Sequence, residues 1–203
     1  MPKGPNGPGD LDESPVLVVG LGNPGAEYER TRHNAGANAV EVLAQRNGEK
    51  LRPIKGMRCL AAEVRMAKRR VTLAFPQTYM NDSGVVMSSL MRRAGVPDPS
   101  GVFVLHDELD LPLGVVRVKL GGGIAGHNGL RSLQAHLHSL AFVRIRIGIG
   151  RPPGRMQGAA YVLKAPRGEE AEAQAAAIET AADAVEVAIS QGVAAAMNRF
   201  NGS

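Results

Sequence analysis

The sequence predicts a single-domain α/β protein built on a mixed twisted β-sheet with helices on both faces. Two observations carry this prediction. Short apolar or alternating segments follow one another along the chain in turn with segments whose apolar residues recur at helical spacing. The length of 203 residues fits one domain, and a hydrophobic content of 44% supplies enough residues for a core. We therefore expect one domain over residues 15–203.

The N-terminal residues 1–14 are rich in Gly and Pro and lack apolar periodicity, which predicts a disordered extension. They also lack the apolar region of a signal peptide, and the sequence has no run of 18 apolar residues. Its single cysteine, Cys59, excludes an internal disulfide. We expect a cytoplasmic protein that does not enter a membrane.

The first half of the chain predicts three strands and two helices. The strands are expected over 16–20, 60–66 and 71–75. Apolar spacing predicts helices over 34–46 and 81–94. Asn81 or Ser83 could provide the N-cap of the second helix, and Gly95 could end it.

The second half continues the alternation of strands and helices. Strands are expected over 102–105, 114–120 and 142–149, and helices over 130–137, 169–191 and 193–199. Within 142–149, charged and apolar residues alternate with period 2, so Arg144 and Arg146 share one face of their strand.

Positive charge is concentrated in one segment. The formal net charge is +5, yet residues 111–159 hold seven Lys or Arg and no Asp or Glu. Such a segment could bind the phosphates of a nucleic acid, or it could form an ordinary solvated face. Aromatic residues make up only 3% of the chain, which argues against a surface that stacks many bases.

The loop after the first predicted strand matches the dinucleotide pattern G-x-G-x-x-G at residues 20–25. Two features argue against that function. The next segment is polar where the phosphate-binding helix should begin, and Pro24 removes a backbone N–H from the turn. We expect the loop instead to present Asn23 at the carboxyl edge of the sheet.

His33 and Asp107 are the candidate acid–base pair. His33 lies between a strand-end loop and a helix start, and Asp107 follows the strand predicted over 102–105. An Asp beside an imidazole fixes its tautomer and prepares the ring to accept a proton. The sequence has no G-x-S-x-G motif, and Cys59 has no neighbouring His, so the nucleophile of a hydrolase would be water.

A metal is the competing use of the same residue types. His33, His106, Asp107, Glu108, Asp110 and His127 are the available ligands, but H-x-x-x-H and H-E-x-x-H spacings are absent. We expect no required metal. Asn81 and Asn128 are each explained by an ordinary cap or turn, although an amide could also hold a water and a carbonyl.

Five segments taken together resemble bacterial peptidyl-tRNA hydrolases. They occur in the order GLGNPGAEYERTRHNAG, PQTYMNDSG, HDELDLPLG, KLGGGIAGHNGLRS and RIRIGIGRPPG, and the similarity extends over about residues 15–200. The resemblance implies a monomeric α/β enzyme that needs no metal or other cofactor. Its reaction would be hydrolysis of the ester between a peptide and the 3′ ribose of tRNA, which recycles tRNA from stalled or aborted translation.

The resemblance also implies residue roles. His33 would be the general base, and Asp107 would orient and polarise it. Asn23 would contact the first carbonyl of the peptide and help to reject unblocked aminoacyl-tRNA. The remaining positions concern binding: Asn81 and Asn128 would place the water and the 3′ end, Tyr28 and Tyr79 would line the cleft, and Lys119 and Arg146 would hold tRNA phosphates.

Two segments depart from the family pattern. Ile124 and Ala125 stand in the glycine-rich loop where the family commonly has a polar residue or Gly and then Gly, which could change the mobility of the loop. The chain also lacks the His that often follows Arg199. Two other functional classes stay open from the residues alone: a non-enzymatic RNA-binding module, supported by the basic segment, and a metal-dependent hydrolase.

Overall fold

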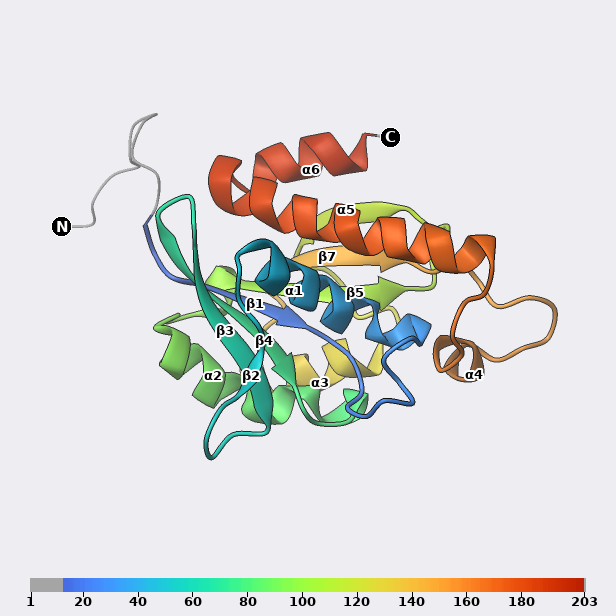
Figure 1. The fold of residues 1–203 in the computed structure, drawn as a ribbon, viewed down its shortest axis with the longest axis horizontal. Coiled ribbons are helices and arrows are strands. Elements are labelled where there is room, and N and C mark those ends of the chain that lie inside the picture. Colours follow the sequence, from blue (N-terminus) through green and yellow to red (C-terminus); the bar gives the residue numbers. More distant parts are fainter. Residues whose placement is uncertain (1–12, 203) are drawn as a thin grey trace.

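The structure, a computed structural model that describes residues 13–202, contains one seven-stranded sheet between two layers of helices (Figure 1). The strands are β1 (Val16–Gly20), β2 (Arg52–Pro53), β3 (Cys59–Met66), β4 (Arg69–Pro76), β5 (Val102–Glu108), β6 (Val116–Leu120) and β7 (Val143–Gly148). The predicted α/β class with a mixed sheet is confirmed. The predicted disordered extension 1–14 lies outside the described residues except for positions 13 and 14.

The strand order is β2-β3-β4-β1-β5-β7-β6. The four central strands, β4, β1, β5 and β7, are parallel, while β2, β3 and β6 join through antiparallel pairs. The chain leaves β1 for β4 on one side and later returns to β5 on the other. This reversal makes the carboxyl ends of β1 and β5 the place where open α/β sheets form crevices.

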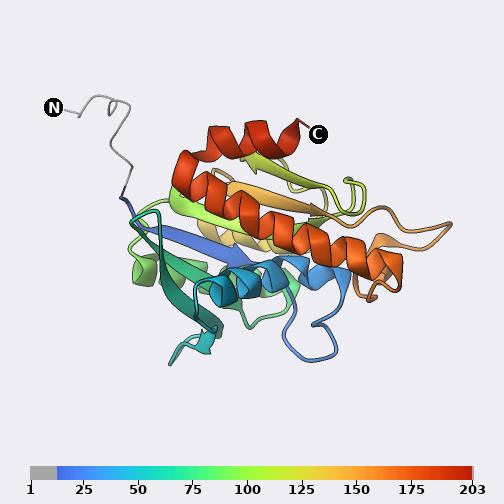
Figure 2. The same ribbon diagram turned by 45° about the horizontal axis from the view of Figure 1, so that its top comes forward.

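Helices cover both faces of the sheet, as Figures 1 and 2 show from two directions. One layer consists of α1 (Ala35–Arg46), α5 (Glu169–Gln191) and α6 (Val193–Asn201). The other layer consists of α2 (Met87–Ala94) and α3 (Asn128–Leu137). Each layer buries its own apolar cluster against the sheet, so the core has two halves separated by the strands.

Helix α1 lies unusually close to the strands beneath it. A Cβ atom on Gly36 would stand 2.1 Å from the backbone oxygen of Leu105, and one on Gly20 would stand 2.3 Å from the oxygen of Gly36. Only glycine fits at both positions. The close approach fixes the start of α1, and therefore His33 just before it, against the ends of β1 and β5.

Most predicted elements are confirmed within a few residues, but the helix predicted over 81–94 is wrong in its first half. A 3₁₀ helix, η2 (Met80–Val86), precedes α2, and neither Asn81 nor Ser83 caps it with its side chain. The cause is tertiary: Gly84 N–H donates to Ser132 Oγ at 2.9 Å, and this turn lies directly on α3. Gly95 ends α2 in the left-handed conformation, as expected.

Two further differences concern the length of β5 and two short elements that the sequence did not predict. Strand β5 is longer than the predicted 102–105 and includes Asp107 itself, because its last residues pair with β7. The sequence reasoning missed the short elements β2 and α4 (Gly158–Val162), which have too few residues to show periodicity. Among the described residues, no helix is long and apolar enough to cross a membrane.

Replacing Gly36 by Ala is expected to lower the free energy of unfolding by about 3 kcal/mol, because the added methyl group would force α1 away from β5. Denaturant unfolding measures the change. Gly123→Ala is the matched control, since a Cβ atom there meets nothing within 4 Å, and it should change stability by less than about 0.5 kcal/mol. Equal stability of the two variants would contradict the close packing of α1.

Candidate active site

The candidate active site lies at the carboxyl ends of β1 and β5. The chain leaves β1 through Asn23, and a loop leads to the 3₁₀ helix η1 (Arg32–Asn34), which carries His33 above the end of β5. Asp107 lies on β5, and the glycine-rich loop before α3 brings His127 to the same place. Four separate segments therefore meet at one edge of the sheet.

His33 and Asp107 form the expected pair. His33 Nδ1 lies 2.9 Å from each carboxylate oxygen of Asp107. The carboxylate accepts, so Nδ1 carries the proton and the lone pair of His33 is at Nε2. The side chain of Asp107 is 2% exposed and that of His33 is 12% exposed, so the imidazole edge is the part that solvent and substrate can reach.

His127 is a member of the site that the sequence reasoning considered only as a metal ligand. Its Nε2 lies 2.9 Å from Asp107 Oδ1. Its Nδ1 accepts hydrogen bonds from the backbone N–H groups of Gly129 and Leu130, at 3.1 and 3.3 Å, and so caps α3. A nitrogen that accepts cannot carry a proton, which leaves the proton of this neutral ring on Nε2, where it donates to Asp107.

Buried groups support this arrangement from below. The His106 ring lies 4.9 Å from the His127 ring, edge to face, and its Nδ1 donates to the backbone oxygen of Asp107 at 2.7 Å. Complete burial, with His127 and Arg144 nearby, holds the pKa of His106 well below its ordinary value, so this ring is neutral. Its Nε2 then accepts from Arg144 Nε at 3.2 Å.

The Asp107 carboxylate is charged despite its burial. Burial alone would raise its pKa, but the electrostatic attraction and hydrogen bonds of His33 and His127 outweigh that effect, and the pKa lies below its ordinary value. A buried carboxylate with two imidazole donors is therefore the negative centre of the site.

The same three side chains have the composition of a metal site, since one ligand atom from each of His33, Asp107 and His127 lies within 4.8 Å of the others. The observed hydrogen bonds do not suit a cation. Both imidazole nitrogens that face Asp107 carry protons, and His127 could offer a lone pair there only by losing its bonds to the start of α3.

Asn23 is buried after β1, where its neighbours fix its position; it lines an adjacent cavity of about 420 Å³ and not the pocket of about 140 Å³ that contains His33 and Asp107. Its Oδ1 accepts from the Met80 N–H at 2.7 Å, while its own backbone N–H and oxygen pair with the Asn34 amide at 2.9 Å each. The orientation of the Asn23 amide is thereby fixed, and its Nδ2 group is left to donate to a ligand.

Of the other predicted binding residues, only Asn128 lines the pocket that contains His33 and Asp107. A pocket of about 140 Å³ includes Asn128 together with His33, Asp107 and His127, so Asn128 joins the site. Tyr28 and Tyr79 meet edge to face with ring centroids 6.4 Å apart, and Tyr79 is 54% exposed. Asn81 is exposed at the start of η2 and is not among the residues that line this pocket.

The basic segment is less exposed than its sequence indicates. Arg144 is buried and donates to the backbone oxygen of Gly123 at 2.6 Å, so it supports the glycine-rich loop from inside. Arg146 lies 3.0 Å from a carboxylate oxygen of Glu108, an acid outside the segment. Lys119 is exposed on β6 beside Gly122. Of the two predicted phosphate contacts, Lys119 has no ion pair among the described residues.

Comparisons with known proteins identify the family of this chain. The sequence model of the peptidyl-tRNA hydrolase family matches residues 17–203. The peptidyl-tRNA hydrolase of Nocardia farcinica is 49% identical over 187 residues, which are 92% of this chain and 96% of that protein. The crystal structure of peptidyl-tRNA hydrolase from Acinetobacter baumannii is 38% identical, with a TM-score of 0.85 over 92% of this chain and 94% of that one.

A second solved structure, a complex of peptidyl-tRNA hydrolase with N-propanol, has a TM-score of 0.85 and 39% identity over 92% of this chain and 94% of the other. The fold and these relatives define an enzyme that acts on an ester bond. The chain belongs to the peptidyl-tRNA hydrolase family, since the family model and relatives near 49% identity both extend over nearly the whole of it. Its reaction is the hydrolysis of peptidyl-tRNA.

The stability of the fold should depend on the charge of Asp107. An unfolded Asp titrates near pH 3.9 and the folded group titrates lower, so its contribution is present above about pH 4 and is lost as the pH falls further. In urea unfolding, the stability of the wild type relative to Asp107→Asn should therefore decrease from about pH 5 to pH 3. The exposed Asp82→Asn is the control. A difference between wild type and Asp107→Asn that stays constant over this range would contradict the shifted pKa.

Proposed function

We propose that His33, oriented and polarised by Asp107, is the general base that activates water in the hydrolysis of peptidyl-tRNA. The single observation that carries this proposal is the His33–Asp107 pair, because it puts the imidazole proton on Nδ1 and leaves the Nε2 lone pair at the accessible edge. Nε2 would take the proton of a water as that water attacks the ester carbonyl.

Transfer of this proton from His33 to the leaving group completes the reaction. Attack of the water forms a tetrahedral intermediate, whose collapse breaks the bond from the carbonyl carbon to the 3′ oxygen of the ribose. The imidazolium of His33 returns its proton to that oxygen, which leaves as the hydroxyl of free tRNA, and the peptide leaves as a carboxylic acid. Asp107 stabilises the imidazolium in between without accepting its proton.

Amide groups supply the remaining contacts in this scheme. The Asn23 Nδ2 group, held by the Met80 and Asn34 bonds, would donate to the first peptide carbonyl, a group that unblocked aminoacyl-tRNA lacks. Asn128, which lines the pocket beside His33, would place the water or stabilise the developing oxyanion. Asn81, an exposed residue two positions after Tyr79, would contact the 3′ end of the tRNA.

The size of the catalytic effect suits an ester. General-base assistance accelerates a reaction by roughly a hundred- to ten-thousandfold, which is about 3–5 kcal/mol of barrier. General-base assistance together with oxyanion stabilisation is enough for an already reactive ester. An unactivated amide needs a larger reduction of its barrier. The hydrogen-bonded state of the triad His33, Asp107 and His127 supports a reaction without metal.

The tRNA body would lie on the β6–β7 side of the site. Lys119 and Arg146 belong to these two strands, and their charges would neutralise phosphates of the acceptor stem. We also propose that the enzyme works as a monomer in the cytoplasm, where its substrate arises during translation.

Replacing His33 by Ala is expected to reduce kcat for peptidyl-tRNA cleavage at least about a hundredfold with little change in KM, because only the chemical step loses its base. Asp107→Asn should also reduce kcat strongly, since a neutral amide cannot stabilise the imidazolium that His33 becomes. Single-turnover cleavage of N-acetylated peptidyl-tRNA measures both. His138→Asn, which changes an exposed histidine at the end of α3, is the control. Near-wild-type turnover by His33→Ala would disprove the mechanism.

The same assay with EDTA separates the alternative functions. Cleavage that EDTA leaves unchanged supports the metal-free base. Cleavage that EDTA abolishes and zinc restores would make the cluster of His33, Asp107 and His127 a metal centre, and binding without cleavage would indicate an RNA-binding module.

Removal of the basic side chains should separate tRNA binding from chemistry. Lys119→Ala should raise KM at unchanged kcat and lower the slope of log KM against log salt by about one phosphate contact. Arg146→Ala should have a smaller effect, because Glu108 already neutralises this guanidinium. KM is measured over a salt series, with Arg65→Ala on the distant β3–β4 hairpin as control. A salt slope unchanged in Lys119→Ala would show that this cation contacts no phosphate.

A further inference from the structure

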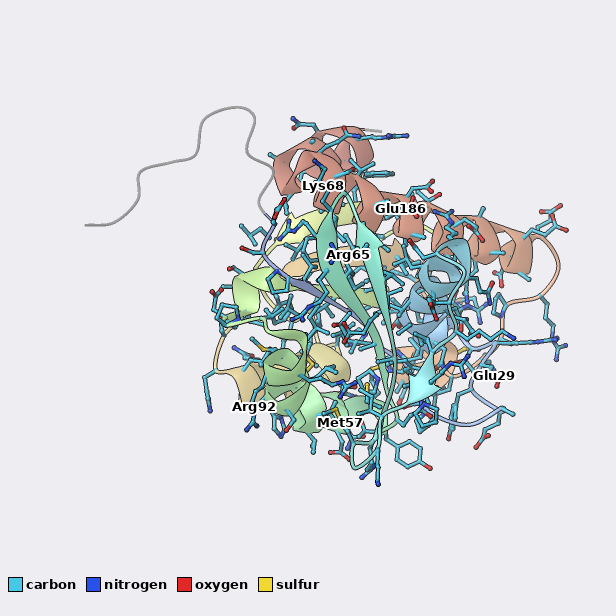
Figure 3. All side chains as sticks on the ribbon, turned by 60° about the vertical axis from the view of Figure 1, so that its left-hand side comes forward. Glu29, Met57, Arg65, Lys68, Arg92 and Glu186 are labelled. Carbon is cyan, nitrogen blue, oxygen red and sulfur yellow. The ribbon has the colours of Figure 1, made fainter. Side chains whose placement is uncertain are left out.

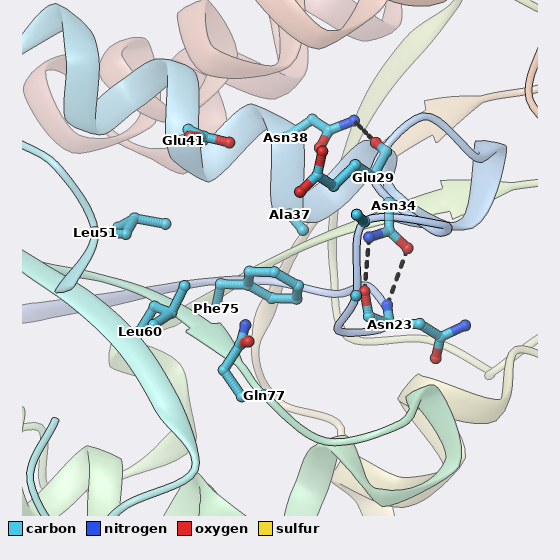
Figure 4. A pocket seen from close by; sticks show the side chains of 12 residues that line it. Asn23, Glu29, Asn34, Ala37, Asn38, Glu41, Leu51, Leu60, Phe75 and Gln77 are labelled. Carbon is cyan, nitrogen blue, oxygen red and sulfur yellow. Dashed lines mark hydrogen bonds between the residues drawn. The ribbon is translucent and has the colours of Figure 1, made fainter. Parts of the chain in front are cut away.

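A second cavity, distinct from the pocket of His33 and Asp107, is lined by Asn23 and Asn34 among other residues. It has a volume of about 420 Å³, and the hydrogen-bonded pair of Asn23 and Asn34 belongs to its lining (Figure 4). Its walls come from the loop after β1, from α1 and from the facing ends of β3 and β4. The mechanism proposed above gives this cavity no role, although Asn34 directly follows His33.

The lining combines an apolar surface with acids and amides. Leu51, Leu60 and Phe75 form the apolar part, while Glu29 and Glu41 supply two carboxylates. Figure 4 shows both carboxylates on the α1 side, opposite the apolar side chains. None of the residues that line the cavity is Lys, Arg or His.

Three polar side chains of this cavity lack partners within the described chain: Gln77 and the two solvent-exposed carboxylates of Glu29 and Glu41. Neither Glu29 nor Glu41 takes part in an ion pair, and neither side chain has a hydrogen bond there. The Gln77 Nε2 atom is buried without a hydrogen-bond acceptor, and its amide points toward the ring of Phe75. A buried donor without an acceptor is costly, so this amide is suited to a ligand that brings a carbonyl oxygen.

The position of the cavity fits the acyl half of the substrate. Across the sheet, Lys119 and Arg146 belong to β6 and β7, the catalytic pair lies at β1 and β5, and this cavity lies at β4 and β3. Two cations of the β3–β4 hairpin, Arg65 and Lys68, lie near the turn of that hairpin, away from Glu29 (Figure 3). If the tRNA lies on the basic side, the chain on the opposite side of the ester is the peptide, and two unpaired carboxylates would repel RNA there.

We propose that this cavity is a peptide subsite that binds a cationic side chain, such as lysine, of a residue upstream of the ester. The proposal rests on the hydrolytic function proposed above. The apolar stem of a lysine would lie along Leu51, Leu60 and Phe75, and its ammonium group would reach Glu29 and Glu41. Gln77 Nε2 would donate to a backbone carbonyl of the same peptide.

The test is a substrate series on one tRNA. N-acetylated tripeptidyl-tRNAs with the same C-terminal residue carry Lys, Nε-acetyl-Lys or Glu at the second or the third residue from the ester. The wild type should cleave the Lys substrate with a kcat/KM about three- to fivefold above that of Nε-acetyl-Lys at one of these positions, and Glu should be the poorest, because partly exposed ion pairs contribute modestly.

Variants of the two carboxylates identify the source of this preference. Glu29→Gln and Glu41→Gln should each reduce the ratio of Lys to Nε-acetyl-Lys, and the double variant should bring it to about one. Glu49→Gln is the matched control, since this exposed acid follows α1 outside the cavity. Cleavage of the Nε-acetyl-Lys substrate should stay at the wild-type level in all of these variants.

Two results would overturn the subsite. One is a wild-type enzyme that cleaves the three substrates equally at both positions. The other is a double variant that retains the wild-type preference, or that changes kcat/KM equally for every peptide, as expected if the cavity contacted RNA. Either outcome leaves cleavage itself intact, whereas failure of the proposed function would appear as no cleavage of any substrate by the wild type.

Discussion

The site depends on one buried carboxylate that accepts hydrogen bonds from two imidazoles. Asp107 is almost fully buried on β5, and His33 and His127 both donate to it at 2.9 Å. A buried charge is tolerated only when its partners satisfy it, so the two rings cannot leave without a large cost. The same requirement assigns their protons. His33 must carry its proton on Nδ1, and its lone pair is therefore directed away from Asp107.

The fold supplies this interaction by bringing distant segments to one edge of the sheet. Gly36 allows α1 to approach β5 closely enough to fix His33, and the start of α3 fixes the tautomer of His127 through two backbone N–H groups. Beneath them, the guanidinium of Arg144 connects the neutral ring of His106 with the glycine-rich loop at Gly123. The geometry of the candidate site is thus a consequence of packing.

Sequence reasoning predicted the fold class and the pairing of His33 with Asp107, because strand ends in a parallel sheet meet at one edge. It did not predict the role of His127, since a histidine is an unusual helix cap and 20 residues separate it from Asp107. It also treated Arg144 as one cation of a basic face. Period-2 alternation shows which residues share a face, but whether that face is covered depends on the loop of residues 121–127, which has no periodicity.

The most direct test of this account is the protonation of the histidine rings. Long-range ¹H–¹⁵N spectra of the free enzyme at about pH 8, where imidazoles are ordinarily neutral, report which nitrogen carries each proton. The hydrogen bonds to Asp107 predict the Nδ1–H tautomer for His33 and the Nε2–H tautomer for His127, with His33 reverting toward Nε2–H in Asp107→Asn. A wild-type His33 in the Nε2–H form would contradict this assignment, because the lone pair would then face Asp107 and no base would face the substrate.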